Sequence, residues 1–147
     1  MELIIIFIGL TLDRITKIWA STLKGKEGIV VVRNFFRFEY LENRGAAFGI
    51  FQHKLILLSV VTIIVVSAMG YYLISFRPKS KFLRFSLALI ISGAIGNLID
   101  RMFYKYVIDF ILLHYKDVYY YPTFNVADIL VVTGTIMLAI LIIKDVD

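Results

Sequence analysis

One apolar segment limits what this chain can fold into more than any other feature: residues Leu55–Phe76 contain no charged side chain. As an α-helix this segment is about 33 Å long, which matches the thickness of the hydrocarbon core of a bilayer. The chain has 147 residues, of which 60% are hydrophobic, and a soluble domain of this length could not bury that excess in one core. The sequence therefore predicts a membrane protein.

Three further segments are apolar enough to complete a bundle of four transmembrane helices, at about 3–20, 83–101 and 125–143. The first follows Glu2 rather than a basic start, and no small-residue cleavage site follows it, so we expect a retained helix and not a cleaved signal peptide. The connection 77–82 is basic and lacks an acid, which predicts a cytoplasmic loop. The outer loops are then about 21–54 and 102–124, although the cations in 21–54 outnumber its acids and favour the opposite orientation.

The first outer loop contains two β-prone segments, Ile29–Val32 and Phe35–Leu41. In the second, aromatic side chains alternate with charged ones, which is typical of a strand with one apolar face. We expect a membrane all-α protein, one domain over residues 1–147, with a small β-strand platform on the outer face.

Composition excludes several kinds of site. The chain has no cysteine, which excludes disulfides, thiolate metal sites and a cysteine nucleophile, and its two histidines are too few and scattered for a metal cluster. We therefore expect no metal and no cofactor. The net charge of +5 is dispersed among apolar runs, which favours membrane lipids as partners and not nucleic acid.

Charged residues inside the predicted helices are the candidate functional residues, because a charge in a bilayer is costly. Asp13 and Lys17 are four residues apart on one helix and can pair; a self-neutralising ion pair is the alternative to a functional role.

Two later groups also place polar side chains on one helix face. Asn97, Asp100 and Arg101 lie at a predicted helix end, where a hydrogen-bonded helix terminus is the alternative. Asn125 and Asp128 share a face at the start of the last helix; Asn125 suits an N-cap, whereas Asp128 lies one turn deeper.

Five motifs together resemble the bacterial lipoprotein signal peptidases, also called signal peptidase II. They occur in the family's order: Asp13-x-x-Thr-Lys17, Asn43-Arg-Gly-Ala-Ala-Phe-Gly49, Gly93-Ala-Ile-Gly-Asn-Leu-Ile-Asp-Arg101, Val107-Ile-Asp-Phe110 and Phe124-Asn-Val-Ala-Asp128. Ser92 departs from the pattern, since the family more often has a glycine there. Serine is small enough to keep close helix packing.

The resemblance implies an aspartic endopeptidase with Asp109 and Asp128 as its catalytic pair. It implies supporting or substrate-binding roles for a further set of residues, namely Asp13, Lys17, Asn43, Gly45, Asn97, Asp100, Arg101 and Asn125. The implied substrate is a diacylglyceryl-modified prolipoprotein, cut just before the lipidated cysteine. The implied location is the bacterial cytoplasmic (inner) membrane, with several spans and the active site toward the outer face, and we expect a monomer.

Helix geometry gives a test of the catalytic pair. On one continuous helix, residues 100 and 109 would lie about 180° apart, so only one of the two aspartates can face Asp128. We expect Asp109 to do so, and the adjacent Arg101 to neutralise Asp100. The two paired carboxylates would share one proton across a water molecule. The aromatic side chains of the platform and segment 43–49 would clamp the substrate.

Three other functions remain open at this point. Intramembrane acids also serve ion or proton transport, but the chain shows no inverted repeat. A non-catalytic scaffold would use the polar residues only for helix packing. A presenilin-type protease would carry a Gly-x-Gly-Asp motif, which this sequence lacks.

Overall fold

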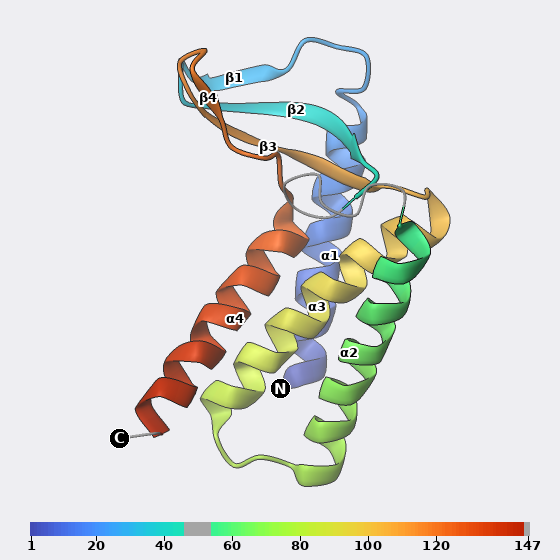
Figure 1. The fold of residues 1–147 in the computed structure, drawn as a ribbon, viewed down its shortest axis with the longest axis vertical. Coiled ribbons are helices and arrows are strands. Elements are labelled where there is room, and N and C mark those ends of the chain that lie inside the picture. Colours follow the sequence, from blue (N-terminus) through green and yellow to red (C-terminus); the bar gives the residue numbers. More distant parts are fainter. Residues whose placement is uncertain (46–53, 146–147) are drawn as a thin grey trace.

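The computed structural model describes residues 1–45 and 54–145. Within them the chain forms helices α1 (Glu2–Ser21), α2 (Leu55–Phe76), α3 (Lys81–Phe103) and α4 (Val126–Asp145). It also forms strands β1 (Ile29–Val32), β2 (Phe36–Asn43), β3 (Val107–Tyr115) and β4 (Tyr119–Tyr120). The strands form a sheet across one end of the helix bundle, and both chain ends lie toward the other end (Figure 1).

The helices match the four segments predicted from the sequence, with ends shifted by a few residues at most. In the described part of the chain, α2, α3 and α4 are long and apolar enough to cross a membrane, whereas α1 carries three charges in its second half, at Asp13, Arg14 and Lys17. Helix α2 contributes no buried residue, as expected of a helix surrounded by lipid. The structure is that of a multi-pass membrane protein with a small antiparallel sheet.

Helix α3 is the centre of the bundle and packs against the other three helices. Small residues on α3 make these contacts close, and Ser92 keeps the close packing expected of it: its hydroxyl donates to the Ile6 carbonyl of α1 at 3.2 Å. A Cβ at Gly93 would overlap the Ala127 carbonyl of α4, and one at Gly96 would lie 2.7 Å from Asp13. Small side chains therefore bring the polar faces of α1, α3 and α4 together.

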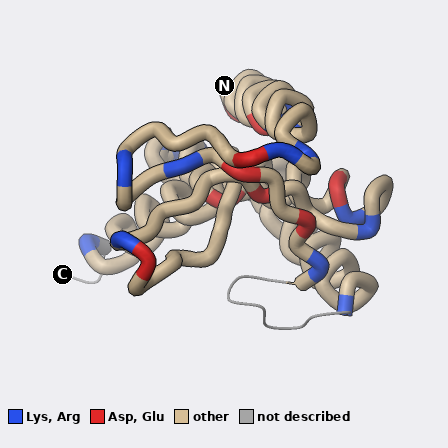
Figure 2. The backbone as a smooth tube through the Cα atoms, turned by 90° about the horizontal axis from the view of Figure 1, so that it is seen from above, with Lys and Arg blue, Asp and Glu red and all other residues tan. Residues whose placement is uncertain are grey.

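The sheet has the strand order β1-β2-β3-β4, with every neighbouring pair antiparallel. Charged residues of both signs lie along its strands and turns (Figure 2). Strand β3 lies within the predicted outer loop 102–124, where the sequence had not indicated a strand. Its first half, Val107–Phe110, is buried throughout and therefore lacks the alternation that marks a strand. Because α3 ends at Phe103, Asp109 lies on a strand and not on that helix.

The aromatic face of β2 anchors the sheet to the end of α1. The Phe38 ring packs edge-on against Trp19, at 5.1 Å between ring centroids, and lies 4.8 Å from Phe36. Trp19 also packs against Phe110 of β3 at 6.1 Å. Phe110 and Ala20 belong to a small apolar core against which Phe38 packs, and this core holds the sheet against the end of α1.

Candidate active site

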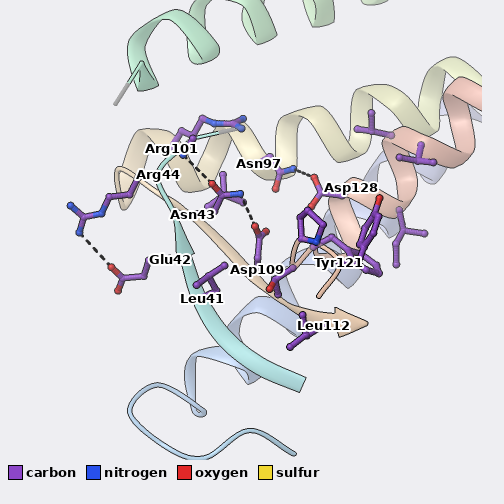
Figure 3. A pocket seen from close by; sticks show the side chains of 18 of the residues that line it. Leu41, Glu42, Asn43, Arg44, Asn97, Arg101, Asp109, Leu112, Tyr121 and Asp128 are labelled. Carbon is purple, nitrogen blue, oxygen red and sulfur yellow. Dashed lines mark hydrogen bonds and ion pairs between the residues drawn. The ribbon is translucent and has the colours of Figure 1, made fainter. Parts of the chain in front are cut away.

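A cavity of about 1310 Å³ lies between the sheet and the helices and contains most of the predicted site residues (Figure 3). Asn43 and Asp109 enter it from adjacent strands, at positions close to each other in the β2–β3 register. Asn97 and Arg101 enter it from successive turns of α3, and Asp128 enters it from the first turn of α4. Residues separated by up to 85 positions in the chain thus share one cavity.

The aromatic side chains of β2 that were expected to clamp the substrate do not line the cavity. Glu39, Leu41 and Asn43 line the cavity, while the alternate side chains Phe38 and Tyr40 pack in the apolar core. Of the segment 43–49 that was expected to take part in the clamp, residues 43–45 line the cavity and residues 46–49 lie outside the described part of the chain.

Asn125 links the two candidate catalytic carboxylates. Its side-chain Nδ2 donates to Asp109 Oδ1 at 2.6 Å, and its backbone N–H donates to Asp128 Oδ2 at 3.1 Å. The Asp128 backbone N–H in turn donates to Asn125 Oδ1 at 3.0 Å. This reciprocal pair is a capping box at the start of α4, so the predicted N-cap role of Asn125 is confirmed. The same box fixes the Asp128 carboxylate.

Two further asparagines complete the hydrogen bonding of the pair. Asn97 Nδ2 donates to Asp128 Oδ1 at 2.7 Å, and Asn43 Nδ2 donates to Asp109 Oδ2 at 2.8 Å. With Asn125, every oxygen of the two carboxylates accepts an N–H group. The hydrogen bonds hold both side chains in fixed orientations at the cavity wall.

Burial sets the protonation of Asp109, whose side chain is 1% exposed. The loss of hydration, reinforced by the negative charge of Asp128, raises the pKa of Asp109 to about 7. The hydrogen bonds from Asn43 and Asn125 act in the opposite direction, because they favour the ionised carboxylate. Asp109 can therefore hold a proton near neutral pH, as a general acid requires.

A buried ion cluster lies behind the cavity. The predicted pair is confirmed, since Lys17 Nζ is 3.0 Å from Asp13 Oδ2, and the same nitrogen is 2.9 Å from Asp100 Oδ2. Asp100 also pairs with Arg14 at 2.6 Å. The expectation that Arg101 neutralises Asp100 is wrong: the neighbours of Asp100 lie on α1, which sequence adjacency could not show. Asp100 does not line the cavity.

The two acids of this cluster hold the backbone beside the candidate catalytic residues. Asp13 Oδ1 accepts the N–H of Ala127, next to Asp128, at 3.1 Å. Asp100 Oδ2 accepts the N–H of Ile108, next to Asp109, at 3.1 Å. These two acids therefore hold α4 and β3 in position and do not line the cavity.

Some residues of the site had not been selected from the sequence. Arg14 lies between Asp13 and Lys17 in a segment with charges of both signs, and its sequence position did not indicate a partner. The fold shows that it pairs with Asp100. Glu39 and Leu41 of β2 line the cavity. The alternation of side chains along β2 shows that the strand has two different faces, but it does not show which face lines the cavity. In the described residues, no group of three or more acidic or histidine side chains is arranged to hold a metal ion.

Comparisons with known proteins agree over nearly the whole chain. The family model described as signal peptidase (SPase) II matches residues 5–144. The lipoprotein signal peptidase of Clostridium novyi (strain NT) is 60% identical over 146 residues, covering 99% of each chain. That of Clostridium acetobutylicum is 58% identical over 144 residues, covering 97% of this chain and 94% of the relative. A bacterial membrane enzyme solved by the in meso method at 2.3 Å resolution superposes with a TM-score of 0.90 at 32% identity, over 99% of this chain and 89% of its own. The chain therefore belongs to the signal peptidase II family.

Proposed function

We propose that Asp109 and Asp128 are the catalytic pair with which this aspartic endopeptidase removes signal peptides from prolipoproteins. The observation that carries the proposal is the pair itself, bridged by Asn125 at the wall of a cavity that both carboxylates reach. Transport would not explain why one asparagine joins two acids at the end of a helix. A scaffold would have no need of an acid pair at the wall of a large cavity.

The pair supports a water-mediated hydrolysis. Asp128, ionised, takes a proton from a water molecule, whose oxygen attacks the scissile carbonyl carbon. Asp109, protonated because of its raised pKa of about 7, gives its proton to the carbonyl oxygen. The tetrahedral intermediate collapses when Asp128 transfers its proton to the departing amide nitrogen and Asp109 recovers one from the intermediate. Both products then leave with the dyad in its starting state.

The shape of the cavity supports a lipid-modified substrate. Its lining extends from the sheet to Thr62 of α2 and Val132 of α4, two helices that lie on opposite sides of α3 (Figure 1). A second apolar cavity of about 480 Å³ is lined by the same three helices, with Tyr72 from α2 and Leu138 from α4. These apolar walls between the helices suit a signal-peptide helix and acyl chains that stay in lipid. We propose cleavage just before a diacylglyceryl-modified cysteine.

The charges of the bundle support an orientation with the sheet outside the cell. The α2–α3 connection and the first turn of α3 carry four cations and no acid, namely Arg77, Lys79, Lys81 and Arg84. By the positive-inside rule this end faces the cytoplasm, and so do both chain ends. Helix α1 then serves as a fourth span, because Asp13 and Lys17 in its second half are paired and buried within the bundle. The active unit is a single-domain monomer in the bacterial cytoplasmic membrane.

A direct test compares two versions of one precursor. The purified protein, reconstituted in lipid, is given a diacylglyceryl-modified prolipoprotein and its unmodified twin, and the released signal peptide is quantified. We expect the modified precursor to be cut before the lipidated cysteine and the twin to be cut at least about ten-fold more slowly, because buried acyl chains contribute binding energy. Equal cutting of both would refute the proposed specificity, and cutting of neither would refute the function.

A further inference from the structure

The three asparagines of the site share one arrangement. Each directs its side-chain N–H₂ group at a carboxylate of the pair, and each has its Oδ1 held by a donor on the other side. Backbone N–H groups do this for two of them: Gly45 N donates to Asn43 Oδ1 at 3.0 Å, and Asp128 N donates to Asn125 Oδ1 at 3.0 Å. Local chain geometry thus fixes these two amides.

Asn97 differs, because its main fixed donor is a charged side chain from another helix. Lys17 Nζ donates to Asn97 Oδ1 at 2.9 Å, and Asn125 Nδ2 adds a longer contact at 3.1 Å. Lys17 is 0% exposed and does not line the cavity. Two carboxylates, Asp13 and Asp100, lie within 3.0 Å of its ammonium and compensate its charge. The ammonium is therefore a fixed, dry hydrogen-bond donor.

An amide can be turned by half a rotation with almost no change in shape, so its direction depends on its partners. If the Asn97 amide were reversed, its N–H₂ group would face the Lys17 ammonium and its oxygen would face the Asp128 carboxylate. Both contacts would be repulsive. With Lys17 present, Asn97 can only donate to Asp128.

We propose that Lys17 is a positioning residue that acts through Asn97, locking its amide so that an N–H group always points at Asp128. This inference rests on the proposed function and deepens it. Lys17 does not line the substrate cavity, and the Asn97 hydrogen bond is the contact through which it reaches the carboxylate pair. Its charge also acts on both carboxylates through space, and the Asn97→Ala background separates that action from the lock. By holding a donor on Asp128, it favours the ionised form of that carboxylate and fixes its orientation toward the attacking water.

The test is a double-mutant cycle on the full-length protein with the diacylglyceryl-modified precursor. Turnover and KM are measured for the wild type, Lys17→Met, Asn97→Ala and the double variant. We expect Lys17→Met to lower kcat about ten-fold or more and to change KM less than about two-fold, since the cavity lining is intact. In the Asn97→Ala background the same change should lower kcat less than about two-fold further.

Removing Lys17 alone leaves Asp13 and Asp100 with one cation fewer. If the Lys17→Met variant does not accumulate, a charge-balanced variant is used instead. Asp13→Asn/Lys17→Met removes one charge of each sign and keeps the Arg14–Asp100 pair. In the double-mutant cycle this variant replaces Lys17→Met, and Asp13→Asn replaces the wild type; each is measured with and without Asn97→Ala. The expected pattern of kcat losses is the same.

Two results would overturn the inference. A ten-fold loss of kcat in both backgrounds would mean that Lys17 acts on the fold and not through Asn97, and unchanged kcat in Lys17→Met would mean that the lock is not needed. Both results require a wild-type protein that cuts the precursor, so they leave the proposed function standing. A wild type that does not cut would refute the function instead.

Discussion

Replacing Asn43 by alanine removes one of the two amide groups that donate to Asp109. Asn43 Nδ2 lies 2.8 Å from Asp109 Oδ2, and this hydrogen bond favours the ionised carboxylate. Without this hydrogen bond, burial and the charge of Asp128 still raise the pKa of Asp109, while fewer interactions remain that lower it. The pKa of Asp109 must therefore rise further above about 7 in the variant.

The size of the shift follows from the strength of the lost bond. A hydrogen bond to a charged group contributes about 1.5–3 kcal/mol, and about 1.4 kcal/mol corresponds to one pKa unit. Asn43 is only half-buried, so water replaces part of the interaction, and we expect a shift of about one unit. Because Asp109 must be protonated to act as the acid, activity is lost as the pH rises through its pKa.

The assay is the pH dependence of kcat/KM for the modified precursor in lipid, between about pH 5 and pH 10, because kcat/KM reports the pKa values of the free enzyme. The wild type should lose activity on the basic side with a midpoint near pH 7, and Asn43→Ala should move that midpoint upward by about one unit. Thr62→Ala, which alters the cavity wall on α2 without touching Asp109, should leave the midpoint in place. A basic limb that stays fixed or moves downward in Asn43→Ala would refute Asp109 as the acid.

Three further predictions concern the packing around the site. Gly93→Ala should destabilise the fold by about 1–3 kcal/mol, because the added Cβ would overlap the backbone of α4. Gly70→Ala is the control and should be neutral or slightly stabilising, because the space around Gly70 is open. Thermal melting in detergent checks both variants. Asp100→Asn should cost about 3 kcal/mol or more, because it removes one of the two acidic partners of buried Lys17 and the close partner of Arg14, and the variant should accumulate poorly on immunoblots. Phe38→Ala should lower the melting temperature by weakening the core beneath the sheet, while Leu41→Lys should slow cleavage at unchanged melting temperature; the reverse pattern would mean that the faces of β2 are assigned wrongly.

The helices could be predicted from the sequence because lipid imposes one simple rule. A helix that crosses a bilayer needs a long apolar run, and the predicted bounds of α2 are those that the structure shows. The same rule identified the charged residues inside the helices as candidates, because such charges are costly without partners. Asp13 and Lys17 pair as their spacing predicted.

The sheet could be predicted only in part, because its pairing joins distant segments. Strands β1 and β2 lie near their predicted positions, but β3 pairs with β2 across more than 60 residues, and no local pattern specifies that partner. The burial of β3 on both faces also hides the period of two that identifies strands. Without β3, the side of β2 that faces the cavity could not be chosen.

The ion cluster shows a second limit of sequence reasoning. Asp100 was expected to use its neighbour Arg101, but it pairs with Arg14 and Lys17 on a helix more than 80 residues earlier. Small residues on α3 allow α1 to approach closely enough for these pairs to form. The assignment of Asp109 in preference to Asp100 as the neighbour of Asp128 came from the motif, and the bridge through Asn125 gives its geometric basis.

The most direct measurement of the central claim is the single-turnover cleavage rate of the diacylglyceryl-modified precursor by Asp109→Asn and by Asp128→Asn, each at a folded amount equal to the wild type. Asparagine keeps the size and much of the hydrogen bonding of each side chain but can neither give nor take the proton, so both rates should fall about 10³-fold or more. A cleavage rate like that of the wild type in either variant would remove that aspartate from the mechanism and contradict the account.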